Sequence, residues 1–326
     1  LAYRYATRQH YDWRRDPTLL QSYALEIQKR LKQRPVDLLL SPSTLPVSFL
    51  DCKQPVVFWT DGVYAQLSRY YPSKLPISKH QEQEGNSIEQ QALSRCRLAL
   101  FSSEWACNGA LEYYDVSRSK LHAVSFGANF QPIALDKITT AINNRSRDSC
   151  KLLFLAVDWH RKGGDVAWQT HEAVKRLGLK ATLTIVGCKP PSYIPISEGV
   201  TVIPFLNKNS PTGEERLIDL VSQSHFLILP SRADATPIVI CEANSLGVPC
   251  LSTRTGGIPS LITPDVNGRL FPLDAPADDY AQYIVQLFAN YSLYLQLAKS
   301  SLGEYERRLN WTSSARHVSD LLKSLV

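Results

Sequence analysis

Methionine is absent from all 326 residues of the sequence, and the first residue is Leu1. We therefore expect either that the chain is a fragment or that methionines are missing from the sequence. No apolar run approaches the roughly 18–20 residues that cross a bilayer, and no charged and apolar leader opens the chain. These absences predict a soluble, cytoplasmic protein.

Cysteine pairs are absent as well. The seven cysteines are odd in number, and none lies two or three residues from another, as zinc ligands would. We expect free thiols in a reducing compartment.

Glycine (15) and proline (20) are too few, and apolar residues (44%) too many, for a collagen-like or disordered chain. The length exceeds the roughly 250–300 residues at which single cores stop growing, which favours two domains.

An excess of one charge is confined to the start of the chain. Residues 1–35 hold eight Lys and Arg against three acids, so they carry +5 of the total +6 and leave +1 for the rest. This balance is too even for nucleic-acid binding. The basic residues could meet anionic lipid, as a peripheral membrane contact, or an anionic acceptor; alternatively they form a solvated helix face. They are Arg4, Arg8, Arg14, Arg15, Lys29, Arg30, Lys32 and Arg34.

Several common motifs of enzymes are missing. The sequence contains no G-x-G-x-x-G, no P-loop, no H-E-x-x-H and no G-x-S-x-G, which excludes the usual nicotinamide, protease and hydrolase sites. No D-x-D occurs, the motif with which many nucleotide-sugar enzymes hold a divalent ion. We therefore expect no metal site and no cofactor.

The periodicity of apolar residues predicts alternating strands and helices. Thr18–Leu31 has helical spacing, with Asp16 as cap and Pro17 in the first turn. Short apolar runs predict strands at 36–41, 55–61, 97–103, 120–129, 152–157, 181–187, 200–205, 226–231 and 248–253. Helix-length segments, such as 165–177 and 214–221, separate most of the later runs. This pattern is typical of α/β domains with parallel sheets covered on both faces.

The pattern divides the chain into four parts. We predict a Rossmann-like domain over 1–134, a polar linker over 135–150, a second Rossmann-like domain over 151–309 and a C-terminal helix over 310–326 that packs back on the first domain. His225, at the start of a buried strand, is expected to be structural.

Two loops in the second domain are candidate binding segments, because parallel sheets bind ligands at the carboxyl ends of their strands. The first reads DWHRKGGD (158–165), where Arg161 and Lys162 precede Gly163 and a helix. Two cations and a helix amino-terminus suit a diphosphate. The alternative is a solvated basic turn.

The second loop begins at Pro230. Thr236 and Pro237 are expected to be the N-cap and first residue of a helix that contains Glu242. Asp234 precedes this helix. Two carboxylates can accept hydrogen bonds from vicinal hydroxyls and thus bind sugar rings. The alternative is a turn aspartate and a solvent-facing glutamate.

These segments resemble glycosyltransferase family 4, the retaining nucleotide-sugar enzymes of GT-B fold. PSRADATPIVICEANSLGVPCLSTRTGGIPSLI (230–262) is similar to the family's E-x7-E block and its G-G-x-P turn. AVDWHRKGGD, TLTIVG and LNWTSSARHV, and before them FWTDGVYAQLSRYYP and FSSEWACNGALEYYDVSRSKLHAVSFGAN, fall in the expected order. The resemblance covers nearly the whole chain and implies two Rossmann-like domains, acceptor-side then donor-side, whose parallel sheets face each other across a cleft.

The resemblance also implies roles for individual residues. Lys162 and Arg161 would bind the donor diphosphate, Glu242 the ribose hydroxyls, and Asp234 hydroxyls of the transferred sugar. The implied catalytic residues are Asp61, Arg161, Lys162 and Asp234, and the implied donor-binding residues are Arg161, Lys162, Gly163, Asp234, Thr236, Pro237, Ile238, Glu242, Gly256 and Gly257. The donor would be a UDP- or GDP-hexose, and the acceptor a glycan or a lipid-linked molecule.

The chain departs from the family pattern at three positions. Asp234 stands where the family has Glu, Ala156 where many members have Arg, and Asp61 where many have His. The family's opening strand and Gly-rich loop have no counterpart before the run at 36–41, so we expect the first domain to lack its opening.

The implied reaction is transfer of a hexose with retention at the anomeric carbon. The leaving diphosphate would take the proton of the acceptor on the same face, and the cations and helix amino-termini would stabilise the charge that develops. Two alternatives stay open. One is an inactive nucleotide-sugar-binding module, which Asp61 and Ala156 permit; the other is an epimerase or phosphorylase of GT-B fold.

Overall fold

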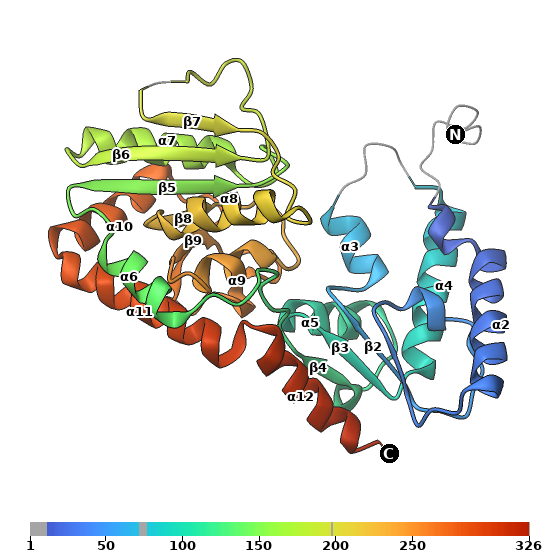
Figure 1. Cartoon of the computed structure of the whole chain (residues 1–326). Helices are drawn as coiled ribbons and strands as arrows, with labels where there is room; N and C mark the ends of the chain where they lie inside the picture. Colours follow the sequence, from blue (N-terminus) through green and yellow to red (C-terminus); the bar gives the residue numbers. More distant parts are fainter. Residues whose placement is uncertain (1–11, 72–76, 197, 326) are drawn as a thin grey trace. The chain divides into compact units, whose positions relative to one another are not determined.

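The computed structural model (Figure 1) describes residues 12–71, 77–196 and 198–325. Arg4 and Arg8, which the sequence analysis singled out, lie outside the described residues. The chain divides into two units: unit 1 comprises Leu1–Ser125 and Arg316–Val326, and unit 2 comprises Phe126–Ala315. Each unit has its own all-parallel sheet. The α/β class with two Rossmann-like domains is therefore confirmed.

Unit 1 is built on a four-stranded sheet of order β1-β2-β3-β4. Its strands are β1 (Leu39–Ser41), β2 (Val56–Thr60), β3 (Leu98–Phe101) and β4 (Leu121–Ala123). Its helices are η1 (Trp13–Arg15), α2 (Pro17–Gln33), η2 (Leu45–Val47), α3 (Tyr64–Tyr70), α4 (Lys79–Arg95), α5 (Glu104–Tyr113) and η3 (Arg118–Lys120). The strands are shorter than the apolar runs that predicted them; residues 36–38 and 124–129, for example, lie outside β1 and β4.

The start of α2 follows from two adjacent residues. The carboxylate of Asp16 accepts hydrogen bonds from the N–H groups of Thr18 and Leu19, which would otherwise have no partner in the first turn. Pro17 occupies the first position, where no N–H is needed. The predicted cap and the predicted helix are both confirmed.

The last helix, α12 (Trp311–Lys323), carries residues of unit 1. Val318 is buried in one apolar cluster with Val57 of β2 and with Leu98 and Leu100 of β3. Leu321, Leu322 and Leu325 pack against the same cluster, so one apolar stripe of this segment is buried in unit 1. The segment Arg316–Val326 therefore belongs to the core of unit 1.

Unit 2 has a six-stranded sheet of order β10-β9-β8-β5-β6-β7. Its strands are β5 (Ser149–Leu155), β6 (Lys180–Val186), β7 (Val200–Ile203), β8 (Phe226–Leu229), β9 (Cys250–Thr253) and β10 (Gly268–Phe271). Its helices are α6 (Leu135–Asn143), α7 (Gly164–Arg176), α8 (Pro211–Ser222), α9 (Ile238–Asn244), η4 (Ile258–Ser260), α10 (Ala277–Ala289) and α11 (Tyr291–Arg308). The sequence analysis did not predict β10, since GRLF is only four residues long and contains just two large apolar residues.

Residues 135–150, for which the sequence suggests a linker, hold α6 and the start of β5. Ile138 and Ile142, four residues apart, are buried against unit 2. Arg145, which is 5% exposed, donates hydrogen bonds to the carbonyl oxygens of Ser222, Leu246 and Gly247 and to a tyrosine hydroxyl. The polar residues that suggested a linker thus include one that ties α6 to the ends of α8 and α9.

His225 lies at the amino end of β8 and is fully buried. Its Nδ1 accepts a hydrogen bond from the N–H of Lys151, and its Nε2 lies 2.8 Å from the carbonyl oxygen of Ser146. Burial lowers the pKa of His225 to about 4, because the charged form would lose its hydration. The expectation of a structural histidine agrees with these contacts.

The seven cysteines form no disulfide. Within the described ranges, no helix is both long enough and apolar enough to cross a membrane.

Replacing Arg145 by Met should destabilise unit 2 strongly. The substitution leaves the carbonyl oxygens of Ser222, Leu246 and Gly247 buried without donors, which we expect to cost about 2–4 kcal/mol. Urea unfolding followed by circular dichroism measures the loss. The exposed Arg147, replaced by Met in the same way, is the matched control and should change stability by less than about 0.5 kcal/mol; equal effects of the two substitutions would contradict this account.

His225 should make unit 2 less stable in acid. The unfolded chain takes up a proton on this residue below pH 6.5, but the folded chain does so only near pH 4. The free energy of unfolding should therefore fall as the pH drops from 6.5 to 4, by roughly 3 kcal/mol in total. Urea midpoints across this range measure the slope. His225→Asn should flatten it and His160→Gln should not; an unchanged slope in His225→Asn would show that other groups cause it.

Candidate functional site

Strand order in unit 2 reverses between β5 and β8, which are neighbours in the sheet. The chain leaves β5 toward β6 on one side and returns to β8 on the other. Loops that follow two such strands diverge at the carboxyl edge of the sheet, and open α/β sheets bind ligands at this point. The loops after β5 and β8 are the two segments that the sequence analysis selected.

The loop after β5 places two cations next to the start of α7. Asp158 orders this loop: its carboxylate accepts the N–H of Arg161 at 3.0 Å and lies 3.4 Å from the Nε of the same residue. The hydrogen bond from the Arg161 backbone, together with the charge of its guanidinium, lowers the pKa of Asp158. The guanidinium of Arg161 donates to the carbonyl oxygen of Ala233, in the loop after β8.

Gly163 brings the two loops into contact. Its φ of 76° lies in the left-handed region, and a Cβ at this position would collide with the carbonyl group of Pro230. The N–H groups of Gly163 and Gly164 donate to the carbonyls of His160 and Trp159. The glycines therefore permit a close approach of backbone to backbone, while their own N–H groups are already bonded.

Arg232 ties the loops together from the other side. Its guanidinium donates to both carboxylate oxygens of Asp165, at 2.9 and 2.7 Å, and to the carbonyl of His160 at 2.6 Å. Its own N–H donates to the carbonyl of Arg161. Paired hydrogen bonds of this kind fix orientation as well as distance. The sequence analysis missed this contact, since the two partners lie 67 residues apart.

Lys162 and Asp234, two of the predicted site residues, form an ion pair. Their side chains are 13% and 8% exposed, so the pair is shielded from water. Burial lowers the pKa of Lys162, and the charge and hydrogen bond of Asp234 act in the opposite direction. The structure thus places a cation and a carboxylate together at the ends of β5 and β8.

Glu242 lies inside α9, as predicted, and is 1% exposed. Lys208, from the loop between β7 and α8, donates to its Oε1 at 2.5 Å. The Lys208 side chain is 38% exposed and the Glu242 side chain 2%, so the lysine covers a buried carboxylate from the solvent side. Sequence reasoning missed Lys208, because it considered the loops after β5 and β8 but not the one after β7.

The predicted N-cap of this helix is wrong. α9 begins at Ile238, and Pro237 is its N-cap, with no side-chain hydrogen bond. Pro237 has an extended ψ of 93°, so the helical turn starts one residue later than the sequence suggests. Thr236 therefore lies outside the helix, in the loop that leads from Asp234.

The predicted Gly-Gly turn reaches the same place. Gly256 has a φ of 53°, and the N–H of Gly257 donates to the carbonyl oxygen of Asp234 at 3.1 Å. The turn follows β9, the strand next to β8. The loops after three neighbouring strands, β5, β8 and β9, therefore meet at Asp234 and its ion-pair partner Lys162.

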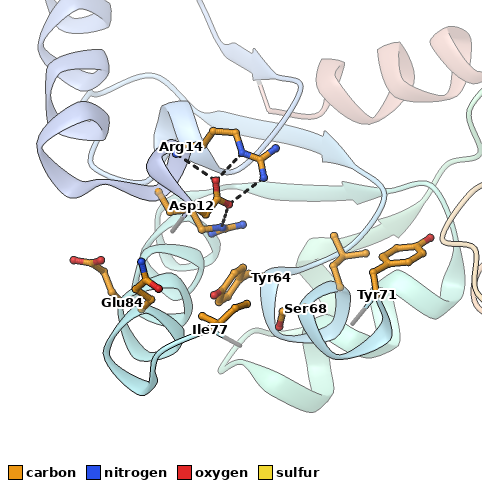
Figure 2. Close-up of a pocket in the computed structure, with 10 residues that line it drawn as sticks. Asp12, Arg14, Tyr64, Ser68, Tyr71, Ile77 and Glu84 are labelled. Atoms are coloured by element: carbon orange, nitrogen blue, oxygen red, sulfur yellow. Dashed lines mark hydrogen bonds and ion pairs between the residues drawn. The ribbon is translucent and has the colours of Figure 1, made fainter. Parts of the chain in front are cut away.

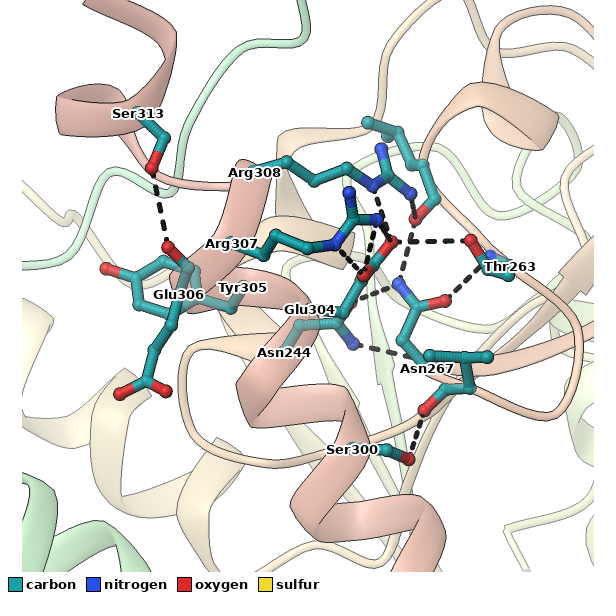
Figure 3. A network of polar contacts seen from close by, with 12 residues as sticks. Asn244, Thr263, Asn267, Ser300, Glu304, Tyr305, Glu306, Arg307, Arg308 and Ser313 are labelled. Atoms are coloured by element: carbon teal, nitrogen blue, oxygen red, sulfur yellow. Dashed lines mark hydrogen bonds and ion pairs between the residues drawn. The ribbon is translucent and has the colours of Figure 1, made fainter. Parts of the chain in front are cut away.

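A polar network contacts the end of α9 and the residues that follow the Gly-Gly turn (Figure 3). Glu304 of α11 pairs with Arg307 and Arg308 at 2.8 and 2.5 Å, and Arg308 donates to the carbonyl oxygens of Ser260 and Leu261. The buried side chains of Asn244 and Asn267 bond to each other at 2.7 Å. Since Asn244 is the last residue of α9, this network fixes the helix that carries Glu242.

Asp61 belongs to unit 1, where it follows the last residue of β2 and precedes Gly62. It thus lies at the carboxyl edge of its own sheet, as the sequence analysis expected. In the same unit, three of the basic residues near the start of the chain form ion pairs: Arg14 with Asp12, Arg15 with Glu89, and Arg30 with Glu26. Among the described residues, no group of three or more His, Cys, Asp and Glu is arranged to hold a metal ion.

Loss of the Arg232 contacts should loosen the loop after β5 without unfolding unit 2. The Arg232 and Asp165 side chains are 47% and 29% exposed, so Arg232→Met should lower stability by less than about 1 kcal/mol. Amide hydrogen exchange of residues 158–165 should nevertheless rise several-fold, because the paired hydrogen bonds that orient this loop are gone.

The control for this experiment is Arg176→Met, which removes an ion pair with Asp278 whose side chains are 65% and 59% exposed. Exchange of residues 158–165 should stay at the parent rate in that variant. If Arg232→Met also leaves the exchange unchanged, the Arg232 side chain does not order this loop, and the other contacts between the two loops suffice.

Part of this chain is similar in sequence to known glycosyltransferases. Residues 149–290 match the family model of glycosyl transferases group 1. The D-inositol 3-phosphate glycosyltransferase of Corynebacterium kroppenstedtii is 24% identical over 138 residues, 42% of this chain and 30% of that protein. The protein of the same name from Corynebacterium urealyticum is 20% identical over 266 residues, 76% of this chain and 61% of that protein.

Two solved structures share the fold over both units. Sucrose-phosphate synthase from Thermosynechococcus elongatus has a TM-score of 0.70 at 16% identity and covers 94% of this chain and 78% of its own. HepE from Anabaena, in complex with UDP, has a TM-score of 0.69 at 13% identity and covers 93% of this chain and 82% of its own. The family model thus matches part of unit 2, and the two solved structures show that this chain shares their fold.

Proposed function

We propose that this protein is a retaining glycosyltransferase of family 4, which transfers a hexose from a UDP- or GDP-hexose to a glycan, polysaccharide or lipid-linked acceptor. The observation that carries the proposal is the ion pair of Lys162 and Asp234 at the strand-order reversal of unit 2. A nucleotide sugar needs a cation for its diphosphate and acceptors for its hydroxyls, and this edge of the sheet supplies both.

The donor would be bound by side chains from three loops. Lys162 and Arg161 contact the diphosphate, and the amino-terminus of α7 adds its partial positive charge. Asp234 accepts hydrogen bonds from hydroxyls of the hexose, and Glu242 from those of the ribose. Lys208 holds one oxygen of Glu242, at 2.5 Å, which leaves the second oxygen for a ribose hydroxyl. Residues 236–238 and the turn at 256–257 line the rest of the site.

The chemical step exchanges one bond to the anomeric carbon for another. The bond to the diphosphate oxygen breaks, the acceptor oxygen forms the new bond on the same face, and the acceptor proton passes to the leaving diphosphate. Negative charge grows on the diphosphate as the bond breaks, and Lys162 and Arg161 stabilise it. These cations make a divalent metal unnecessary in the proposed mechanism. Asp61, which follows β2 in unit 1, is a further proposed catalytic residue.

Calorimetric titration with UDP, GDP and ADP, with and without magnesium, tests the donor site. One nucleotide should bind equally well in both conditions. Lys162→Ala should weaken its binding at least tenfold, since a cation next to the diphosphate is lost, and Glu242→Ala should do so because ribose contacts are lost. A tenfold loss corresponds to about 1.4 kcal/mol.

Two exposed residues of unit 2 give matched controls. Lys299→Ala on α11 and Glu215→Ala on α8 remove the same charges away from the strand ends and should leave the affinity unchanged. Binding of no nucleotide, or equal loss in the controls, would contradict the donor site. Tight binding of a nucleotide sugar without transfer to any acceptor would favour an inactive binding module.

A further inference from the structure

Lys208 reaches Glu242 from a loop of unit 2 that carries none of the predicted site residues. The loop lies between β7 and α8, and the Nζ of Lys208 is 2.5 Å from the Oε1 of Glu242. The lysine side chain is 38% exposed and the glutamate side chain 2%. An opposite charge offsets the cost of burying a carboxylate, which is large when the partner is missing. Glu242 therefore depends on a cation from a separate loop.

The main chain around Lys208 is tied to the start of α8. The carbonyl oxygen of Asn207 accepts hydrogen bonds from the N–H of Ser210 at 3.1 Å and from its hydroxyl at 2.9 Å. The side-chain oxygen of Asn207 accepts the N–H of Asn209 at 3.0 Å. A Cβ on Gly213, in the first turn of α8, would collide with the Asn207 carbonyl. The backbone at Lys208 is thus fixed, and the contacts of its side chain decide where the ammonium group lies.

An aromatic ring lies on another side of this ammonium group. The Nζ of Lys208 is 5.9 Å from the centre of the ring of Phe130, which is buried. The segment that carries Phe130 is held next to α8, because the N–H of Gln131 donates to the carboxylate of Glu214 at 3.0 Å. A cation at this distance from a ring face is attracted to it. The ring and Glu242 therefore both favour the position that Lys208 takes.

Two other ion pairs are more open to water. In unit 1, an exposed Arg14 donates to both carboxylate oxygens of Asp12, as Figure 2 shows. In unit 2, Lys175 lies in the last turn of α7 and pairs with Glu172; their side chains are 35% and 29% exposed. Pairs of this kind contribute little, because water competes for both partners. The carboxylate of Glu242 has almost no contact with water, so its lysine partner matters more.

The position of Lys208 bears on the ribose hydroxyls that Glu242 is proposed to bind. The two oxygens of a carboxylate share one carbon atom, so a hydroxyl that donates to Oε2 comes close to the ammonium group that donates to Oε1. An ammonium group has three donors and no acceptor, whereas a hydroxyl has one donor and two lone pairs. One ribose hydroxyl can thus donate to Glu242 and accept from Lys208. The C–H group of a deoxyribose can do neither.

We propose that Lys208 and Glu242 together select donors that carry a ribose, and that donors built on 2′-deoxyribose, such as thymidine diphosphate sugars, are rejected. A deoxyribose leaves both charged groups without the partner that they share. A site built to bond a hydroxyl discriminates strongly against an analogue that lacks it. This role of Lys208 rests on the proposed function, because it takes Glu242 as the ribose contact.

Calorimetric titration of the full chain tests this selection, with whichever of UDP, GDP and ADP binds and with the 2′-deoxy analogue of that nucleotide. The parent should bind the ribonucleotide at least about tenfold more tightly than the analogue. Lys208→Met keeps the length of the side chain but removes its charge. It should weaken the ribonucleotide at least about fivefold and change the affinity of the analogue less than about twofold, so the ratio of the two dissociation constants falls.

The matched control is Lys175→Met, which makes the same substitution at a lysine of similar exposure at the other end of α7. Both affinities should equal those of the parent. Lys208→Arg keeps the positive charge and should keep the ratio within about threefold of the parent value. Circular dichroism and thermal melting confirm that each variant is folded, and a general loss of binding-competent protein would leave the ratio unchanged.

Three results would overturn the role of Lys208 alone. They are equal binding of the ribonucleotide and its analogue by the parent, an unchanged ratio in Lys208→Met, and tighter ribonucleotide binding in Lys208→Met, which would mean that the lysine competes with the ribose for Glu242. Binding of no nucleotide by the parent would instead overturn the donor site, and the role of Lys208 with it.

Discussion

The close approach of Gly163 to the carbonyl of Pro230 is the constraint on which the site in unit 2 depends. It joins the loops after β5 and β8, which leave neighbouring strands of the sheet. Once these backbones touch, Lys162 meets Asp234, Arg161 meets Ala233, and Arg232 meets Asp165. Each of these contacts is modest by itself, but together they hold a buried cation and a buried carboxylate in one place.

The opposite edge of the same sheet is fixed by different chemistry. There Arg145 donates to carbonyl oxygens at the end of α8 and after α9, and the neutral ring of His225 accepts the N–H of Lys151 in β5. Burial favours the uncharged histidine, whereas Nε, Nη1 and Nη2 of the buried arginine each donate to an acceptor. One edge of the sheet is thus held by hydrogen bonds to main-chain groups, and the other carries the paired charges of Lys162 and Asp234.

Much of this arrangement could be predicted from the sequence. Apolar runs located nine of the strands, and Asp16 and Pro17 located the start of α2. The loops after β5 and β8 were selected because each follows an apolar strand, precedes a helix and carries charged residues. What could not be predicted depends on partners far apart in the chain. Lys208 meets Glu242 across 34 residues and Arg232 meets Asp165 across 67, and neither pair has a local pattern. The predicted start of α9 was wrong because Pro237 has an extended backbone, so the helix begins after it despite the capping preference of Thr236.

The contact at Gly163 has a consequence for how this unit can change in evolution. A residue inserted into the loop after β5 would have to be accommodated by the loop after β8, because their backbones leave no space between them. These two loops can diverge only together. The loop after β7 reaches the site through the single flexible side chain of Lys208, so its length can vary without disturbing either of the others. Among related sequences, differences in loop length should therefore be found first in the loop after β7.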